Sequence, residues 1–411
     1  MAGADLGYAG GGRPSEPLRP LTRVFARTDQ NHGGPTEDVR AVAVEDRRGV
    51  GTFIRVPWPL YASDPAWIPP LLLERRYHLA RRRPYFAHAR ARFWVAYRAD
   101  AAVGRISAQI DQLHQERYGD KTGFFGLLEA EDDPRTFHAL FSAAESWLRS
   151  EGMRRVRGPF GLSINEESGL LVDGFDTPPM VLMPHGLPYY PARVEAQGYS
   201  GAKDLLAYRL AADFRMPDLM QAARKKAEGT LAVRQLERRH LRRELATLRA
   251  IFEDAWSHNW GFIPFTEAEF DELGWLLRFI VDDGFVQIAE LDGEAIGMLV
   301  LLPNVHEALR DVNGRLLPLG WLKLLWRLGV RTPRTARVAL MGVRQRYHNT
   351  ALGLAVAALM VEGARSAGRA RGIREVELSW VLEDNHRMRS LLTAIGSVPY
   401  KRYRIYEKSL L

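Results

Sequence analysis

The sequence predicts a mixed α/β fold that is built twice along the chain. The apolar patterns of the first half follow the order strand, helices, hairpin, strand, helix, strand, helix and strand, and the second half repeats this order. The 411 residues are enough for two hydrophobic cores, and 46% hydrophobic with 26% charged residues is typical of a globular protein. We therefore expect a disordered tail at residues 1–45 and two tandem domains at 46–212 and 230–411, joined by a polar linker at 213–229.

The elements of the first half follow from alternating and helical apolar patterns. They are a strand at 52–56, a turn-rich connection at 57–70, an arginine-rich helical patch within 71–89, a hairpin of 93–97 and 103–110, a strand at 123–128, an amphipathic helix at 137–148, a strand from 156 to 160 that opens into an irregular loop at 163–169, a short helix at 191–197 and a strand at 205–210.

The elements of the second half are predicted in the same way. They are a strand at 231–236, helices at 241–256 and 267–280, a hairpin of 285–290 and 295–302 closed at Asp292-Gly293, a strand through 338–343, a helix through 354–364, a strand at 375–381, a helix from Asn385 that stops at Gly396 and a last strand through 403–407.

The strand, loop and helix within residues 334–370 carry the first functional signal. A loop between a strand and the N-terminus of a helix presents free backbone N–H groups and the positive end of the helix dipole. The small residues Ala351 and Gly353 allow a ligand to approach the backbone closely. This stretch predicts a site for a phosphate or a pyrophosphate.

Composition excludes several kinds of chemistry. The chain has no cysteine, which rules out a thiol nucleophile, a disulfide framework and cysteine-bound zinc, and it suits a reducing compartment. The 11 histidines show no metal-ligand spacing, so we expect no metal site. The net charge of +8 favours an anionic partner: nucleic acid, an acidic membrane surface or a phosphorylated cofactor. The sequence shows no signal-type segment and no apolar run long enough to span a bilayer. The chain is therefore predicted to be cytoplasmic, with a peripheral contact at the inner membrane as a further option.

Two motifs of the second half resemble the GCN5-related N-acetyltransferase (GNAT) superfamily. His348-Asn349-Thr350-Ala351-Leu352-Gly353 stands where the family has Gln/Arg-x-x-Gly-x-Gly/Ala, with His348 for the usual Arg or Gln and Ala351 for the first Gly. Glu383-Asp384-Asn385 opens a helix that ends at Gly396, as in the family, whose usual tyrosine acid falls at Leu392. The resemblance implies a mixed sheet and acyl-CoA as co-substrate. The residues it assigns to acyl-CoA are Met341, Val343, His348, Asn349, Thr350, Ala351, Leu352, Gly353 and Asn385.

The corresponding loop of the first half, residues 129–134, is acidic and lacks glycine. Because it would repel a pyrophosphate, the first domain is expected to be degenerate for CoA. Further stretches at 64–70, 158–169, 320–326 and 379–385 resemble a group of bacterial two-domain proteins that includes the bacterial ceramide synthases. That resemblance implies transfer of a long acyl chain from CoA to the amine of a sphingoid base or a similar lipid amine.

Acylation of an amine by a thioester needs a proton acceptor and donors for the developing oxyanion. Glu377 lies in an apolar strand, where it is either a buried base or a solvent-facing residue of an alternating pattern. Asn165, Glu166 and Glu167 lie in a long loop, where they either bind a cationic amine and relay its proton or form a solvated acidic loop. Tyr400 is a candidate for the missing acid, with packing on the last strand as the alternative. Asn385 also fits a helix N-cap.

Trp321 and Trp326 belong to a basic amphipathic segment that suits a membrane interface or the mouth of a lipid site, with an ordinary core-facing helix as the alternative. His306 and Asp311 match a His-x4-Asp acyltransferase signature, which we reject as a chance match without companion motifs. Two other functions stay open: a tRNA-dependent aminoacyl transferase of the Fem kind, and a non-catalytic protein that binds lipid or nucleic acid. A nucleic-acid partner is not favoured.

Overall fold

The structure, a computed structural model, describes residues 38–411 with the exception of 318, 331 and 332. Most of the expected tail, residues 1–37, therefore lies outside the described residues. Residues that the sequence assigns to the end of this tail form β1 (Val39–Ala43), which pairs with β2. Its alternating burial explains the strand, since one face packs on α5 while the other meets solvent.

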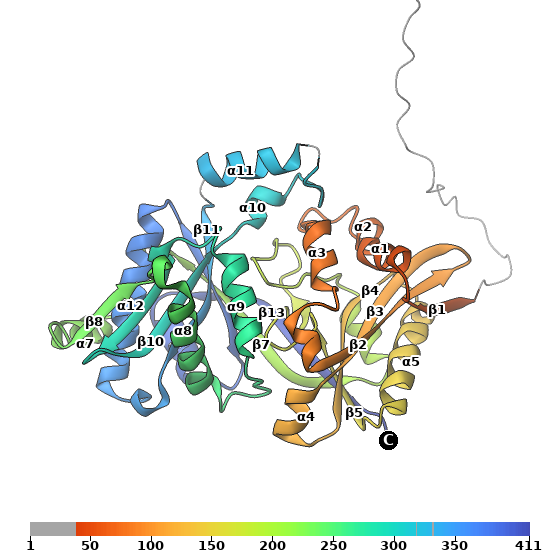
Figure 1. The fold of residues 1–411 in the computed structure, drawn as a ribbon, viewed down its shortest axis with the longest axis horizontal. Coiled ribbons are helices and arrows are strands. Elements are labelled where there is room, and N and C mark those ends of the chain that lie inside the picture. The colour runs from red at the N-terminus through yellow and green to blue at the C-terminus, as the bar shows by residue number, and fades with distance from the viewer. Residues whose placement is uncertain (1–37, 318, 331–332) are drawn as a thin grey trace, which may run out of the picture. The chain divides into compact units, whose positions relative to one another are not determined.

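The strands form one mixed sheet in the order β1-β2-β3-β4-β5-β13-β7-β12-β11-β10-β9-β8, and β6 pairs with β13 (Figure 1). Their bounds are β1 Val39–Ala43, β2 Ala89–Arg98, β3 Ala101–Asp111, β4 Thr122–Ala130, β5 Arg155–Phe160, β6 Leu170–Asp173, β7 Ser200–Ala211, β8 Leu231–Gln235, β9 Val286–Leu291, β10 Glu294–Pro303, β11 Thr335–Val343, β12 Glu375–Leu382 and β13 Val398–Ser409. The predicted mixed sheet is confirmed.

The two halves exchange their last strands. Strand β7, which ends the first half, pairs with β12 of the second half. Strand β13, which ends the second half, lies between β5 and β7. Residues 38–411 consequently form one compact unit. The division into domains at 213–229 stays a prediction, and that stretch holds helix α7 (Asp218–Lys226), whose Met220 packs beneath α12 (Ala351–Ala370).

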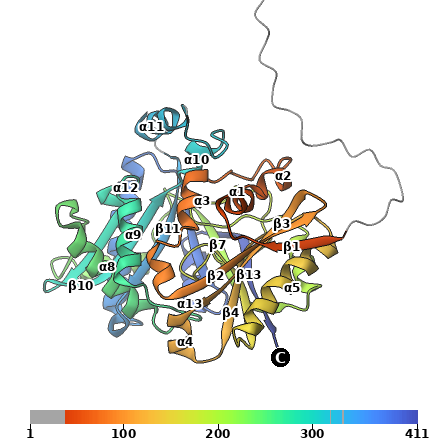
Figure 2. The same cartoon turned by 45° about the vertical axis from the view of Figure 1, so that its right-hand side comes forward.

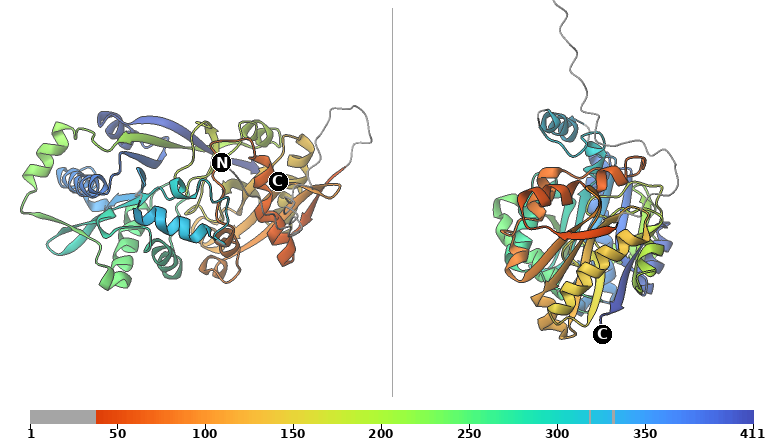
Figure 3. Two further views of the ribbon diagram at one scale, coloured as in Figure 1. Left: turned by 90° about the horizontal axis from the view of Figure 1, so that it is seen from above. Right: turned by 90° about the vertical axis from the view of Figure 1, so that its right-hand side faces the viewer.

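Helices cover both faces of the sheet. Helix α5 (Pro134–Ser150) packs on β1, β2 and β3, as the yellow helix of Figures 2 and 3 shows. In the second half, α8 (Leu241–Trp256) packs on β10 and β11, while α12 packs on β8, β9, β10 and β11 from the other face. The remaining helices are α1 Arg47–Arg55, α2 Pro57–Leu60, α3 Leu72–His78, α4 Gln112–Tyr118, α6 Tyr190–Glu195, α9 Glu267–Leu277, α10 His306–Leu309, α11 Gly320–Val330 and α13 His386–Ala394, with short 3-10 turns at Pro84–Ala87, Arg238–His240, Asp283–Phe285 and Gln345–Tyr347.

The predicted strand at 52–56 is wrong, because residues 52–55 belong to helix α1 and Val56 is its C-cap. Asp46 caps its N-terminus by accepting a hydrogen bond from Gly49 N, and Phe53 and Ile54 are the buried residues of the helix. An alternation over five residues is too short to separate a strand from one helical turn and a half.

Helix α12 is the one helix within the described residues with the length and apolar composition that a membrane span needs. Its Val356, Met360 and Ala364 lie in the core cluster of the second half. A helix that packs in the core of a domain meets the same criteria.

Candidate active site

Strands β11 and β12 part in the middle of the sheet. They pair in parallel from Thr335 and Glu375 to Val338 and Leu378, and the pairing stops there. The register of β11 with β10 also shifts at this point, which leaves Ala339 as a bulged residue. The backbone of β11 beyond Val338 is thus unpaired on the side of β12, and an extended ligand can lie along it.

The loop between β11 and α12 has the geometry that the sequence predicts. Thr350 caps α12, accepting a hydrogen bond from Gly353 N at 3.0 Å. A Cβ at Gly353 would lie 2.2 Å from the carbonyl oxygen of Tyr347, so only glycine fits. His348 Nε2 lies 2.7 Å from the oxygen of Val343, and Asn349 has φ of 62°. This exposed helix start can hold a pyrophosphate, although binding of CoA at these residues stays a prediction.

An apolar cavity lies between α12, α13, β7, β11 and β12. Met341, which the resemblance assigns to acyl-CoA, lines this cavity, whereas Val343 packs against the core cluster. Leu392, at the position of the family's tyrosine, is 5% exposed and also lines the cavity. Asn385 accepts a hydrogen bond from Met388 N at 3.1 Å, which confirms it as the N-cap of α13.

Glu377 lies on the face of β12 opposite this cavity and is 1% exposed, so it does not face solvent. Ser379 Oγ donates to Glu377 Oε1 at 2.6 Å, Tyr400 OH donates to Oε2, and Arg337 Nε lies 3.7 Å from Oε1. Burial raises the pKa of Tyr400, and the neighbouring Glu377 adds to the shift. Both carboxylate oxygens are therefore engaged, and the phenol proton points at the carboxylate. The catalytic roles of Glu377 and Tyr400 stay predictions.

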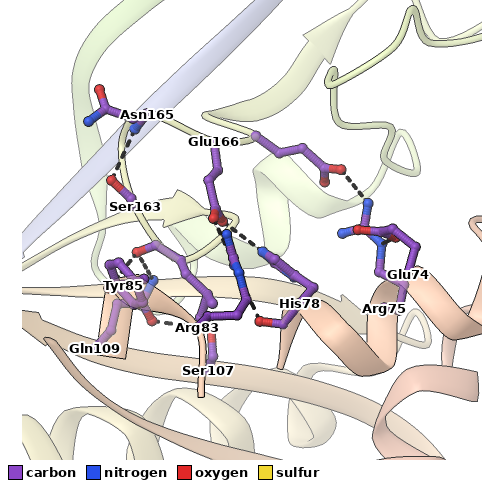
Figure 4. A network of polar contacts seen from close by, with 12 residues as sticks. Glu74, Arg75, His78, Arg83, Tyr85, Ser107, Gln109, Ser163, Asn165 and Glu166 are labelled. Carbon is purple, nitrogen blue, oxygen red and sulfur yellow. Dashed lines mark hydrogen bonds and ion pairs between the residues drawn. The ribbon is translucent and has the colours of Figure 1, made fainter. Parts of the chain in front are cut away.

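The loop of Asn165, Glu166 and Glu167 is tied to the first half by ion pairs rather than left in solvent (Figure 4). Glu166 contacts His78 at 2.7 Å and Arg83 at 3.0 Å. Burial raises the pKa of Glu166, but the interactions with His78 and Arg83 outweigh it and lower the pKa to about 2.

Glu167 and Asn165, the chain neighbours of Glu166, also form contacts with other parts of the protein. Arg75 lies 2.6 Å from Glu167 and likewise lowers its pKa against the effect of burial. Asn165 Nδ2 donates to the oxygen of Ile263 at 3.0 Å, which joins the loop to the second half. Their predicted part in binding an amine is not tested by this geometry.

Sequence reasoning missed two buried charges beside Glu377. Arg337 is 3% exposed and Lys401 is 2% exposed. Lys401 Nζ donates to the oxygens of Thr177 at 2.7 Å and Pro178 at 3.1 Å, and burial lowers the pKa of Lys401 to about 8. A cation within a run of apolar strand residues is the signal that could have identified Arg337, whereas Lys401 stands beside Arg402 in a strand rich in basic residues. No group of His, Cys, Asp and Glu that could hold a metal ion occurs in the part of the chain that the structure describes.

Comparison with known proteins identifies the family. The chain is 45% identical over 376 residues to the bacterial ceramide synthase of Caulobacter vibrioides (strain NA1000 / CB15N), covering 91% of this chain and 98% of that protein. The chain belongs to the bacterial ceramide synthase family. It is also 48% identical over 370 residues to Protein YghO of Escherichia coli (strain K12), covering 89% of this chain and 94% of that protein. No protein-family model matches the chain.

Solved structures agree on the fold. A tandem GNAT protein from the clavulanic acid biosynthesis pathway matches with a TM-score of 0.52 at 15% identity, covering 91% of this chain and 98% of that one. A GCN5-related glucosamine N-acetyltransferase region of a fungal β-N-acetylglucosaminidase matches with a TM-score of 0.56 at 14% identity, covering 91% of this chain and 38% of that one. The predicted tandem GNAT fold is confirmed. Membership of the ceramide synthase family confirms the predicted enzyme class, an acyl-CoA-dependent N-acyltransferase.

Helix α5 of the first half corresponds to α12, and its N-terminus is surrounded by acidic side chains. Asp133 caps α5 and accepts from Arg135 N at 2.8 Å, and Arg98 bonds to Glu131 and Asp133 at 2.5 and 2.6 Å. The guanidinium groups of Arg135 and Arg98 lower the pKa of Asp133. Carboxylates thus lie at the start of α5, and the inability of the first half to bind CoA stays a prediction.

Proposed function

We propose that this enzyme transfers a fatty acyl chain from acyl-CoA to the amine of a sphingoid base or a similar lipid amine. The observation that carries the proposal is the apolar cavity beside the point where β11 and β12 part, in a chain of the ceramide synthase family. Each methylene that leaves water for such a cavity contributes about 0.8 kcal/mol. The cavity therefore favours long acyl donors over acetyl-CoA.

The donor is proposed to lie across the parted strands. Its pyrophosphate meets the start of α12 at Thr350, Ala351 and Gly353, and the thioester lies where β11 leaves its backbone unpaired beyond Val338. The acyl chain enters the apolar cavity past Met341. In this proposal, backbone N–H groups at the gap stabilise the oxyanion. Because the chain has no cysteine, the amine attacks the thioester without an acyl-thiol intermediate.

Helix α11, at the top of Figure 1, is proposed to contact an anionic membrane from the cytoplasmic side. Trp321, Leu322 and Trp326 are 44%, 47% and 56% exposed. Aromatic side chains at this exposure suit the headgroup region, and the net charge of +8 adds attraction to anionic lipid. We expect Trp321→Ser with Trp326→Ser to abolish co-sedimentation with anionic vesicles. Leu219→Ser on α7 is the control, since Leu219 is 71% exposed outside this helix.

The proposed function is tested with purified protein, palmitoyl-CoA and a sphingoid base. The expected result is release of free CoA together with an N-acyl product identified by mass spectrometry. Acetyl-CoA with soluble amines is the comparison. Turnover confined to acetyl-CoA and soluble amines would refute the lipid acceptor while leaving the enzyme class intact.

A further inference from the structure

A second cavity, which we call the polar cavity, lies mainly in the first half. It is lined in part by Trp67, Arg75, Arg105, Glu129, Glu167 and His185, and His306 of the second half also borders it. Met183 also lines it, and the sulfur of Met183 lies 3.5 Å from Ser379 Oγ, the hydroxyl that donates to Glu377. The polar cavity and the buried cluster of Glu377 therefore share a wall.

Two histidines line this cavity, His185 and His306, and Nδ1 of His306 already lies 3.0 Å from the oxygen of Pro179. The side chain of His185 is 4% exposed, and its Nε2 lies 2.8 Å from Asp64 Oδ2. A neutral imidazole that donates Nε2–H to a carboxylate carries its lone pair on Nδ1. Among the residues that the structure describes, none forms a hydrogen bond with His185 Nδ1.

The charges around His185 keep the imidazole neutral. Burial lowers the pKa of His185, and the ammonium of Lys401 on β13 acts in the same direction. Asp64, from the segment between α2 and α3, opposes them. The ring of Tyr61 packs at 5.7 Å on the same imidazole.

The carboxylates near the polar cavity are already engaged. Glu129 Oε2 accepts from Tyr61 OH at 2.7 Å and from Tyr190 OH at 2.8 Å, and its other oxygen lies 3.6 Å from Arg105. Glu167 is paired with Arg75. None of these carboxylates is as free to accept a proton as His185 Nδ1.

Arg105 supplies the complementary group. It is 8% exposed, and its Nε has no hydrogen-bond partner in the described part of the chain. His185 Nδ1 is thus an unpartnered acceptor and Arg105 Nε an unpartnered donor, on two residues that line the polar cavity. This pair matches an amine N–H beside a hydroxyl oxygen, the head group of an amino alcohol.

We propose that the polar cavity holds the amino-alcohol head of the acceptor and that His185 is the general base, with Asp64 as its positioning residue. The proposal rests on the proposed function of N-acylation. The neutral amine nitrogen bonds to the carbonyl carbon, the carbon–sulfur bond breaks and CoA leaves as the thiolate. The proton of the nitrogen moves to His185 Nδ1, and the imidazolium then returns it to the thiolate, giving the amide and free CoA.

The test compares His185→Gln with His114→Gln in the full-length enzyme. His114 is a matched control, because it is 2% exposed, pairs with Asp120 at 3.0 Å and also has an unpartnered Nδ1, but does not line the polar cavity. Loss of a general base lowers kcat by about 10²–10⁴-fold. We expect this loss in His185→Gln and turnover near that of the unmodified enzyme in His114→Gln.

The pH profile separates a base from a structural residue. In the unmodified enzyme, kcat/KM falls with acid as His185 becomes protonated, at a pH below the ordinary histidine range. This acid limb disappears in His185→Gln and moves to lower pH in Asp64→Asn, since the carboxylate no longer stabilises the imidazolium. An unchanged limb and unchanged kcat in His185→Gln would overturn the proposal.

Failure of the proposed function gives a different pattern. If the unmodified enzyme forms no amide with any lipid amine, calorimetric binding of a short-chain sphingoid base tests the polar cavity directly. Binding that His185→Gln weakens and His114→Gln keeps supports the cavity assignment. Absence of binding to the unmodified enzyme contradicts it.

Discussion

The buried ion pair of Arg337 and Glu377 yields a sharp prediction for stability. The two side chains are 3% and 1% exposed, and Glu377 also accepts from Ser379 Oγ at 2.6 Å and from Tyr400 OH. Glu377→Gln keeps the shape of the side chain but removes the negative charge. Arg337 then stays buried without a counter-charge, which costs about 3–5 kcal/mol of the free energy of unfolding.

A double-mutant cycle isolates the pair. We expect Arg337→Met to be destabilising to a similar extent, because it leaves the carboxylate of Glu377 uncompensated. The double variant should cost less than the sum of the two single variants, with a coupling energy toward the upper end of about 0.5–3 kcal/mol. Both partners are excluded from water, so solvent screens their interaction little.

Urea unfolding followed by tryptophan fluorescence measures each variant. Asp218→Asn is the control, since Asp218 pairs with Arg215 at 3.2 Å while their side chains are 85% and 84% exposed. Such an exposed pair contributes about 0–1 kcal/mol. The reasoning is refuted if Glu377→Gln is no more destabilising than Asp218→Asn.

Two further predictions concern the CoA loop and the contact between the halves. Gly353→Ala should raise KM for acyl-CoA, because the added methyl would lie 2.2 Å from the carbonyl oxygen of Tyr347. Gly51→Ala in α1 should leave KM unchanged, because its methyl would lie at an ordinary contact distance of 3.4 Å from the Arg55 side chain. His88 bridges Asp111 at 3.0 Å and Glu269 at 3.2 Å, and although burial alone would lower the pKa of His88, these carboxylates raise it to about 9. Because protonated His88 favours the folded state, its stabilising contribution is fully present below the unfolded-state pKa of about 6.5. This contribution is lost as the pH rises through 9. Between these pH values, the free energy of unfolding should fall by on the order of 2 kcal/mol more in the unmodified enzyme than in His88→Asn.

Local signals predicted much of the second half. The strand, loop and helix of β11 and α12 followed from an apolar strand, a polar loop and a long helical period, and all three are present. Asn385 as an N-cap needed only its own short-range hydrogen bond. Such features depend on residues a few positions apart, which is the range over which sequence patterns are informative.

Features that join distant residues were not predictable. The exchange of β7 and β13 leaves no local pattern, because any apolar strand can pair at either position of the sheet. The partners of Glu166 and Glu167 come from α3 and the turn that follows it, nearly 90 positions earlier, so the loop resembled a free acidic surface. Asp64 and His185 likewise meet only in the folded chain.

Product analysis with palmitoyl-CoA and a sphingoid base tests the central claim most directly. The account predicts a stoichiometric amount of N-acylated sphingoid base for each CoA released, with turnover that falls as the acyl chain of the donor is shortened toward acetyl. Release of CoA without an N-acyl lipid, or equal turnover with acetyl-CoA and palmitoyl-CoA, would contradict it.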